Sequence, residues 1–409
     1  MKSKSNIEIN RRLNYLLSLG ITNKPIQQLQ FTDSPKFSDY ICYHNLPNFA
    51  PYEIFGAGIS LDNDLAMLKA VAECTERISL EQPKQFHKTT FESGAMLDPS
   101  IFINFSNEQL FGKRSEFISD VKNSEYLCVP AHDYLHDKDC LVPGQLAYLT
   151  TFRNEPVLRD RNSNGAAAGF SFEEAFFNGI MELVERDAFM IAYLKQNKPP
   201  KLDYSGIDRI NKLAKYFQRY NLDFQLFDIT SDLNIPVIMA VNIDRTGIGP
   251  AINLGLGCSL DLETAAIKAS LESNLGYNHI RYVKETRGLD EIKSVSDIDT
   301  IAKRSAYWYS TNNIEFIEAW LNTSDTVILK DTNTENNEFE KVLSIIKERD
   351  YTLLSVDITP EQLQSTSIKV IKAIIPELHP FYLNEKFKAL YSVHAGNIPE
   401  ENLPPQPFL

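Results

Sequence analysis

The sequence has 409 residues, a formal net charge of −13, a pI near 5.1, 43% hydrophobic residues and 23% charged residues. These are ordinary globular values, and a chain of this length buries about three quarters of its extended surface, so neither a disulfide nor a metal is needed to hold the fold together. The acidic balance argues against sequence-independent nucleic-acid binding, which depends on Lys and Arg neutralising phosphates.

The cysteines and the apolar runs bear on the compartment. Five cysteines are scattered without a C-x-x-C pair, a pattern typical of a reducing compartment and not of a disulfide framework. The N-terminal stretch has no signal-peptide core, and no run of about 18 apolar residues could span a membrane. We therefore expect a cytoplasmic protein with neither a membrane nor a nucleic acid as partner.

Hydrophobic periodicity predicts a mixed α+β fold. We expect a single domain, 1–409, with a helix and lead-in at 1–50, a core at 51–400 and a proline-rich tail at 401–409. In chain order, the expected elements are a helix over 8–19 that ends at Gly20, buried strands over 235–243, 251–260 and 326–331, and helices over 337–350 and 366–375.

Three segments share one plan: a strand ending in glycine, a short loop and a helix. They cover 56–80, 165–189 and 255–279. In each, an alanine precedes a glutamate by seven residues, or two helical turns, so both lie on one helix face; the pairs are Ala66 and Glu73, Ala175 and Glu182, Ala265 and Glu272. Acidic residues near each helix start are expected to cap free N–H groups: Asp62, Asp64, Glu173, Glu174, Asp261 and Glu263.

The first two repeats add a second glutamate and an arginine, as Glu76-Arg77 and Glu185-Arg186. Residues at i and i+3 are neighbours on a helix, so each helix brings two carboxylates side by side. Like charges held together are costly unless a cation compensates. A single helix of this kind would be interpreted as a solvated face with Glu–Arg pairs, whereas three related copies favour a binding site.

Carboxylates and arginines on three helices predict a triphosphate held through metal ions. Mg²⁺ takes oxygen ligands and is usually shared between carboxylates and substrate phosphates. No P-loop pattern and no correctly placed dinucleotide fingerprint occurs. The small-residue loop N-S-N-G-A-A-A-G at 162–169 precedes a helix start, where backbone N–H groups can approach an anion.

The central repeat, S-N-G-A-A-A-G-F-S-F-E-E-A-x-x-x-G-x-x-E-L-V-E-R-D-A, closely resembles the signature of the YcaO family. The earlier A-x-x-E-C-T-E-R and the later A-x-x-K-A-S-x-E resemble that family's other two glutamate helices, and the match extends over about residues 50–409. The resemblance implies a YcaO-type fold of repeated strand–loop–helix units around a central site for ATP and Mg²⁺.

The resemblance also implies roles for individual residues. The metal ligands would be Glu73, Glu76, Glu182, Glu185 and Glu272. The nucleotide would be bound by Glu73, Arg77, Ser163, Asn164, Glu182, Arg186 and Glu272. Catalytic roles would fall on Glu185, Arg186 and Leu409, the last through its terminal carboxylate if the Pro405-x-Pro407 tail reaches the active site.

The third helix departs from the family pattern. Many relatives have Gln and Arg where this chain has Leu275 and Tyr277, so Asn274, His279 or Arg281 would have to serve there.

The family uses ATP to phosphorylate peptide-backbone amides. In cyclodehydratases, a Cys, Ser or Thr of a ribosomally made peptide attacks the preceding carbonyl, whose oxygen leaves as phosphate, giving thiazoline or oxazoline. We expect this activity, with a precursor peptide, a separate ubiquitin-activating-enzyme-like partner that binds its leader, and a homodimer. Two alternatives stay open: a thioamide-forming enzyme that uses sulfide and a TfuA-like partner, and a non-catalytic nucleotide-binding scaffold.

Overall fold

The structure, a computed structural model, describes residues 4–50, 52–329, 337–401 and 403–408. The helices are α1 (Lys4–Ser18), α2 (Asn63–Glu81), α3 (Arg114–Asn123), α4 (Phe172–Leu194), α5 (Asp208–Gln218), α6 (Leu262–Glu272), α7 (Tyr277–Arg287), α8 (Ile301–Trp308), α9 (Ile314–Leu321) and α10 (Glu338–Glu348). The strands are β1 (Ile26–Gln27), β2 (Ser38–Tyr43), β3 (Phe55–Ser60), β4 (His87–Thr90), β5 (Glu125–Asp133), β6 (Lys138–Pro143), β7 (Ala166–Gly169), β8 (Lys201–Asp203), β9 (Leu222–Asp228), β10 (Val237–Asp244), β11 (Ile252–Cys258), β12 (Thr326–Ile328), β13 (Leu354–Asp357), β14 (Lys369–Ile374), β15 (Tyr391–Ser392) and β16 (Gly396–Asn397).

The three sequence repeats each supply an edge strand of a different sheet. Within the described residues, the sheet orders are β1-β2-β3, β11-β10-β9-β8-β12 and β4-β5-β13-β14-β7, with β6 paired to β5 and a small β15–β16 hairpin. Strands β3, β7 and β11 therefore each have one free edge, and each is followed by its repeat helix, α2, α4 or α6. An edge strand presents unpaired backbone N–H groups, which need other partners.

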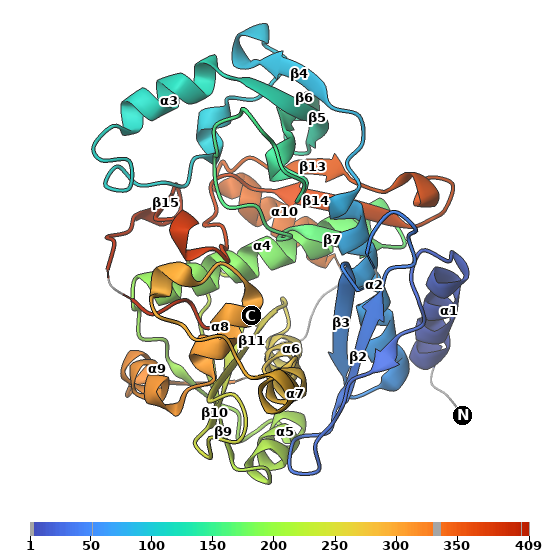
Figure 1. Cartoon of the computed structure of the whole chain (residues 1–409), viewed down its shortest axis with the longest axis vertical. Coiled ribbons are helices and arrows are strands. Elements are labelled where there is room, and N and C mark those ends of the chain that lie inside the picture. The colour runs from blue at the N-terminus through green and yellow to red at the C-terminus, as the bar shows by residue number, and fades with distance from the viewer. Residues whose placement is uncertain (1–3, 51, 330–336, 402, 409) are drawn as a thin grey trace.

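Helix α4 joins the two larger sheets. It crosses the middle of the molecule, with the six-stranded sheet on one side and the five-stranded sheet on the other (Figure 1). Its side chains Phe176 and Phe189 share one buried core with Met239 of β10, Leu254 of β11 and Ile371 of β14. Each such side chain contributes about 1.5–3 kcal/mol through burial, so the position of α4 is fixed from both sides.

Glycines allow the repeat strands to approach their helices closely. A Cβ added to Gly56 would lie 2.2 Å from the backbone nitrogen of Cys74 on α2, and one added to Gly255 would lie 2.2 Å from that of Ser273 after α6. In the second repeat a helix glycine meets the glycine that corresponds to Gly56 and Gly255: a Cβ at Gly179 would lie 2.4 Å from the carbonyl oxygen of Gly165. No side chain fits at these positions, so strand and helix backbones pack directly.

Most predicted elements are confirmed. The structure contains the helices expected at 8–19 and 337–350 and the buried strands expected at 235–243 and 251–260. Gly20 follows the first helix with a φ of 70°, as its role in ending that helix requires. Side chains of Asp62 and Asp261 cap α2 and α6, but Ser171, and not a glutamate, caps α4.

Two predictions are wrong. Residues 366–375 were expected to form a helix, but Lys369–Ile374 is strand β14, hydrogen-bonded between β13 and β7 and almost fully buried. A short apolar run does not distinguish a central strand from a buried helix, and the sheet pairing decided it. The strand expected at 326–331 is present as Thr326–Ile328, but these residues are exposed because β12 ends its sheet; residues 330 and 331 lie outside the described residues.

No helix in the described ranges is both long and apolar enough to cross a membrane.

Candidate active site at the meeting of the three repeat helices

The equivalent glutamate of each repeat binds a backbone N–H of its own repeat. The N–H of Ala57 donates to Glu73 Oε2 at 2.6 Å, that of Leu256 to Glu272 Oε2 at 2.7 Å, and that of Gly165 to Glu182 Oε2 at 3.0 Å. The shared bond explains the constant spacing, because the glutamate lies about three turns into a helix that doubles back beside its strand. It also fixes one carboxylate oxygen of each glutamate, while the second oxygen faces an arginine in the first two repeats: Arg77 donates to Glu73 Oε1, and Arg186 lies 3.8 Å from Glu182 Oε1.

Helices α2 and α4 bring carboxylates together on one side of α4. Glu76 reaches from α2 to β7, where its Oε1 accepts the N–H of Ala168 at 2.8 Å. Burial raises the pKa of Glu76 well above its usual range, and the negative charges of Glu73 and Glu182 raise it further. Three glutamates from two helices therefore repel one another here, and this repulsion favours a bound cation.

A second pair of carboxylates, Glu185 on α4 and Glu272 on α6, lies close to Arg186. Burial raises the pKa of Glu272 to about 7; Glu185 raises it further, whereas Arg186 lowers it. Arg186 forms an ion pair with its neighbour Glu185 and lies 3.8 Å from Glu182 Oε1. The arginine therefore lies among the carboxylates of both contacts, a position suited to an anion bridging them.

Arg77 stays close to its own helix. Its Nη2 lies 2.7 Å from Glu73 Oε1, and its guanidinium lies over the ring of Phe55, 5.2 Å from the centroid. About a third of each charged side chain is exposed, so a phosphate could reach Arg77 from solvent.

The loop before α4 supplies an unpartnered donor. Asn164 is buried, and its Nδ2 has no hydrogen-bond partner among the described residues. Its neighbour Ser163 accepts the N–H of Ala166 through its carbonyl oxygen, and Gly165 turns the chain with a φ of 82°. Because a buried amide donor is costly unless it is bound, an acceptor from a ligand would satisfy Asn164.

The sequence analysis missed two cations beside this loop. Lys372 on β14 is buried, and its Nζ donates to the carbonyl oxygen of Asn162 at 2.9 Å. Burial lowers the pKa of Lys372 to about 7; the charge of Arg159 lowers it further, whereas that of Glu182 raises it. Lys372 lies in the segment mistaken for a helix, so no local pattern pointed to it.

The third repeat helix is shorter than the others. Helix α6 ends at Glu272 itself, and Gly276, with a φ of 76°, starts α7 in a new direction. Leu275 packs in an apolar cluster and Tyr277 donates to Asp244 Oδ2 at 2.7 Å, so neither side chain replaces the family's Gln and Arg. Asn274 is buried with its Oδ1 unpartnered among the described residues, and it remains a candidate ligand.

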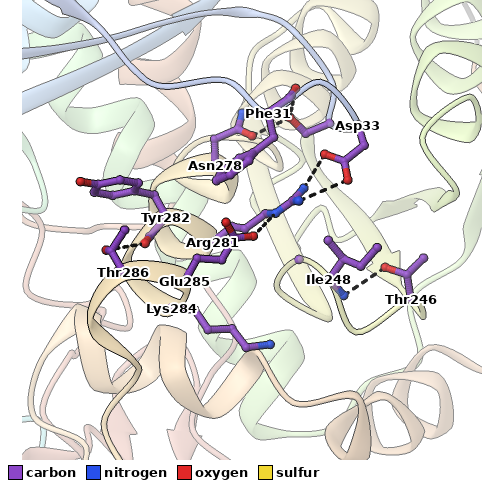
Figure 2. A network of polar contacts seen from close by, with 12 residues as sticks. Phe31, Asp33, Thr246, Ile248, Asn278, Arg281, Tyr282, Lys284, Glu285 and Thr286 are labelled. Atoms are coloured by element: carbon purple, nitrogen blue, oxygen red, sulfur yellow. Dashed lines mark hydrogen bonds and ion pairs between the residues drawn. The ribbon is translucent and has the colours of Figure 1, made fainter.

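Arg281, another candidate for that corner, is occupied elsewhere. Figure 2 shows its guanidinium between Asp33 and Glu285. It lies 2.7 Å from Asp33 Oδ1 and 2.9 Å from Glu285 Oε1, and 4.0 Å from the ring centroid of Phe31. These contacts attach the 31–34 segment to α7. His279 on the same helix is largely exposed.

The C-terminal tail reaches the site. Trp308 Nε1 and Tyr193 Oη donate to Pro405 and Pro404 carbonyl oxygens at 3.1 and 2.8 Å. The ring of buried Phe408 lies against Arg186, with 4.1 Å between the guanidinium carbon and the ring centroid. Leu409, the predicted catalytic terminus, lies outside the described residues, but its neighbour is at the acidic site.

The five glutamates therefore lie in two groups, which share helix α4. Within the described part of the chain, no group of three or more Asp, Glu, His or Cys side chains is arranged to coordinate a metal ion. Mg²⁺ usually needs only one or two protein carboxylates, with phosphates and waters completing its shell. Paired carboxylates, adjacent arginines and unpartnered buried amides fit a nucleotide bound through Mg²⁺.

A family model described as YcaO cyclodehydratase, ATP- and Mg²⁺-binding, matches residues 57–379. The chain belongs to the YcaO family. This match confirms the family and the fold predicted from the three repeats, and ATP and Mg²⁺ are the family's cofactors.

Two relatives match at the sequence level. An uncharacterized protein of Methanothermobacter thermautotrophicus is 26% identical over 339 residues, which cover 80% of this chain and 82% of the relative. An uncharacterized protein in the tfuA 3′ region of Rhizobium leguminosarum bv. trifolii is 27% identical over 253 residues, 57% of each chain.

Solved structures share the fold. A heterocyclase in complex with substrate and cofactor matches with a TM-score of 0.74 and 18% identity over 92% of this chain; this YcaO chain spans about half (53%) of the heterocyclase. YcaO from Methanopyrus kandleri, bound with AMPPCP and Mg²⁺, matches with a TM-score of 0.66 and 18% identity over 99% and 96% of the two chains. The E. coli microcin synthetase McbBCD complex with pro-MccB17 bound matches with a TM-score of 0.62 and 14% identity over 95% and 96%.

Proposed function

We propose that this YcaO chain binds ATP through Mg²⁺ and phosphorylates backbone amides of a ribosomally synthesised precursor peptide. The observation that carries the proposal is the pairing of carboxylates across α2/α4 and α4/α6, with Arg186 among them. An acidic cluster built only for the fold would have to tolerate this repulsion without a ligand, whereas Mg²⁺ would relieve it.

The residues divide the work by position. Glu73, Glu76 and Glu182 would offer one or two ligands to a metal between α2 and α4, and Glu185 with Glu272 would serve a second between α4 and α6, with phosphate oxygens and waters completing each shell. Bound ATP would supply the phosphoryl group that turns a poor leaving group, the amide oxygen, into a good one. Arg186 would stabilise the negative charge that develops during this transfer. No protein nucleophile is required.

We propose azoline formation as the product. In that reaction a Cys, Ser or Thr side chain of the peptide attacks the preceding carbonyl and the phosphorylated oxygen leaves. Two observations support it: the fold is shared with a heterocyclase and a microcin synthetase, and Phe408 of the proline-rich tail lies against Arg186. A leader-binding, ubiquitin-activating-enzyme-like partner and a homodimer complete this proposal.

A thioamide product is the second candidate, because one relative lies in a tfuA 3′ region. In that reaction an external sulfide, delivered with a TfuA-like partner, replaces the amide oxygen. Both products need the same phosphorylated amide, so the acidic site serves either. The free state of all five cysteines supports a reducing compartment, the cytoplasm, for both.

Mass spectrometry of the peptide separates the two products. The purified chain is incubated with Mg-ATP, candidate partner and precursor peptide, with and without sulfide. Loss of one water per modified residue supports an azoline, and exchange of oxygen for sulfur supports a thioamide. An unchanged peptide mass together with unhydrolysed ATP would contradict the proposal.

A Glu185→Gln variant tests catalysis against a scaffold role. We expect ATP turnover to fall by about a hundredfold or more, because a metal ligand beside Arg186 is lost. The matched control is Glu173→Gln, an exposed glutamate in the first turn of the same helix. A scaffold would keep assembling with its partner and would show no ATP turnover even in the unmodified chain.

A further inference from the structure

Two basic side chains beside the acidic site have no acidic partner of their own. Lys372 is 1% exposed and donates only to the carbonyl oxygen of Asn162, at 2.9 Å. Arg159, half-buried on the segment leading into the 162–165 loop, makes no hydrogen bond or ion pair among the described residues. Arg159 stands three residues before Asn162, the residue whose carbonyl oxygen Lys372 binds, and its positive charge lowers the pKa of Lys372.

A donor without an acceptor completes the group. Asn164 Nδ2 is buried and unpartnered within the described part of the chain. A guanidinium, an ammonium and an amide therefore gather around one loop. A buried donor is costly when it is unpaired, and so is a buried ammonium beside a second positive charge. The usual resolution is an anion with several acceptor oxygens.

The position of this group indicates which anion. Lys372 is attracted by Glu182, which also accepts the N–H of Gly165 and belongs to the α2/α4 carboxylates. A ligand here would touch both the basic group and a Mg²⁺ ion held by Glu182. A phosphoryl group fits, because it has three free oxygens and a double negative charge, whereas a carboxylate has two oxygens and one charge.

We propose that Arg159, Lys372 and Asn164 form a cradle for a terminal phosphoryl group. It would hold this group either as the γ-phosphoryl of bound ATP or as free phosphate after transfer. The inference rests on the proposed nucleotide function and adds two positioning residues to it. Arg159 and Lys372 would thereby make the site distinguish a nucleoside triphosphate from a diphosphate.

Binding measurements on Arg159→Met and Lys372→Met test the cradle. Affinity is measured by calorimetry with Mg-ADP and with the non-hydrolysable triphosphate Mg-AMPPCP. Each variant should lose about tenfold or more in affinity for AMPPCP and less than about twofold for ADP, since one charge-assisted contact is removed. Equal losses for both nucleotides, or no loss, would overturn the proposal.

Matched controls separate the loss of the proposed contact from a general loss of positive charge or of folding. Arg153→Met removes an exposed arginine from the same segment, and Lys369→Met removes a lysine from the same strand; both should bind like the parent chain. Melting without ligand should be unchanged or higher in Lys372→Met, because a buried charge is removed. If a methionine variant fails to fold, Arg159→Lys or Lys372→Arg takes its place, and its loss of affinity for AMPPCP should exceed its loss for ADP.

Inorganic phosphate distinguishes the two sources. Phosphate added to the Mg-ADP complex should raise the melting temperature of the parent chain but not of the variants if free phosphate occupies the cradle. If phosphate has no effect while AMPPCP affinity still depends on Arg159 and Lys372, the occupant is the attached γ-phosphoryl. A parent chain that binds no Mg-nucleotide contradicts the proposed function itself; a parent chain that binds, with indifferent variants, contradicts only the cradle.

Discussion

The centroid of the Phe408 ring lies 4.1 Å from the guanidinium carbon of Arg186. This contact connects the C-terminal tail to the carboxylates around Arg186. The same ring packs against Phe189 and Phe381, with centroids 5.9 Å from each. The tail is therefore part of the core and also contacts a candidate catalytic arginine.

Replacing Phe408 by leucine should separate these two roles. Leucine keeps most of the buried volume but removes the ring face, so the free energy of unfolding should fall by only about 1–2 kcal/mol. Turnover should fall more than nucleotide affinity, because Arg186 loses a contact that orients it. Urea unfolding and steady-state kinetics check this, with Phe408→Ala, expected to cost about 3–5 kcal/mol, as the packing reference. Unchanged kinetics in a folded leucine variant would contradict the orienting role.

Close packing of β3 on α2 predicts that Gly56→Ala is severely destabilising. The new methyl group would lie 2.2 Å from a backbone nitrogen of α2, so strand and helix must separate. We expect a loss of about 2 kcal/mol or more in unfolding free energy. The control is Gly206→Ala, where nothing lies within 4 Å of the added Cβ. Equal melting temperatures for the two variants would show that the strand and helix can adjust freely.

Neutralising Glu76 should stabilise the chain without ligand and remove part of its response to metal. Burial and two neighbouring carboxylates oppose the charge of Glu76. The free energy of unfolding of Glu76→Gln should therefore be equal to that of the parent chain or higher by about 1 kcal/mol, and its melting temperature should not fall. The stabilisation that Mg-AMPPCP gives the parent chain should shrink in this variant. Glu81→Gln, at the end of the same helix, serves as control and should respond to Mg-AMPPCP like the parent chain. A Glu76→Gln variant that keeps the full response would exclude Glu76 as a ligand.

A buried histidine should make stability fall at alkaline pH. His394 lies between Asp187 and Asp232, with its ring nitrogens 2.8 and 2.5 Å from their carboxylate oxygens. Burial alone would lower the pKa of His394, but the hydrogen bonds and charges of the two carboxylates outweigh it and raise the pKa to about 9.

The folded-state pKa is thus above the unfolded value of about 6.5. The stabilisation is fully present below that unfolded value and is lost as pH rises through about 9. Urea unfolding between pH 6 and 10 should show a loss on the order of 2 kcal/mol that is absent in His394→Gln. Parallel pH profiles for the two proteins would contradict this assignment.

The local sequence determined which glutamates lie on the same face of each repeat helix. The repeat of alanine and glutamate two turns apart fixed which face of α2, α4 and α6 carries Glu73, Glu182 and Glu272, because helical periodicity depends on neighbouring residues only. The same repeats identified the family, and through it the cofactors. The roles of the individual glutamates and of Ser163, Asn164 and Leu409 stay predictions, and the variants above test those of Glu76 and Glu185.

Only the tertiary structure decided which of these parts face one another. Glu76 lies near Glu182, and Glu185 near Glu272, because edge strands β7 and β11 both pack on α4, while α2 also packs on β7 and α6 on β11; no local pattern encodes such long-range packing. For the same reason the sequence predicted a helix where β14 places Lys372 beside Arg159, and it did not reveal that Phe408 lies on Arg186. Periodicity depends on short-range geometry, whereas the cation pair and the tail contact depend on how distant segments pack.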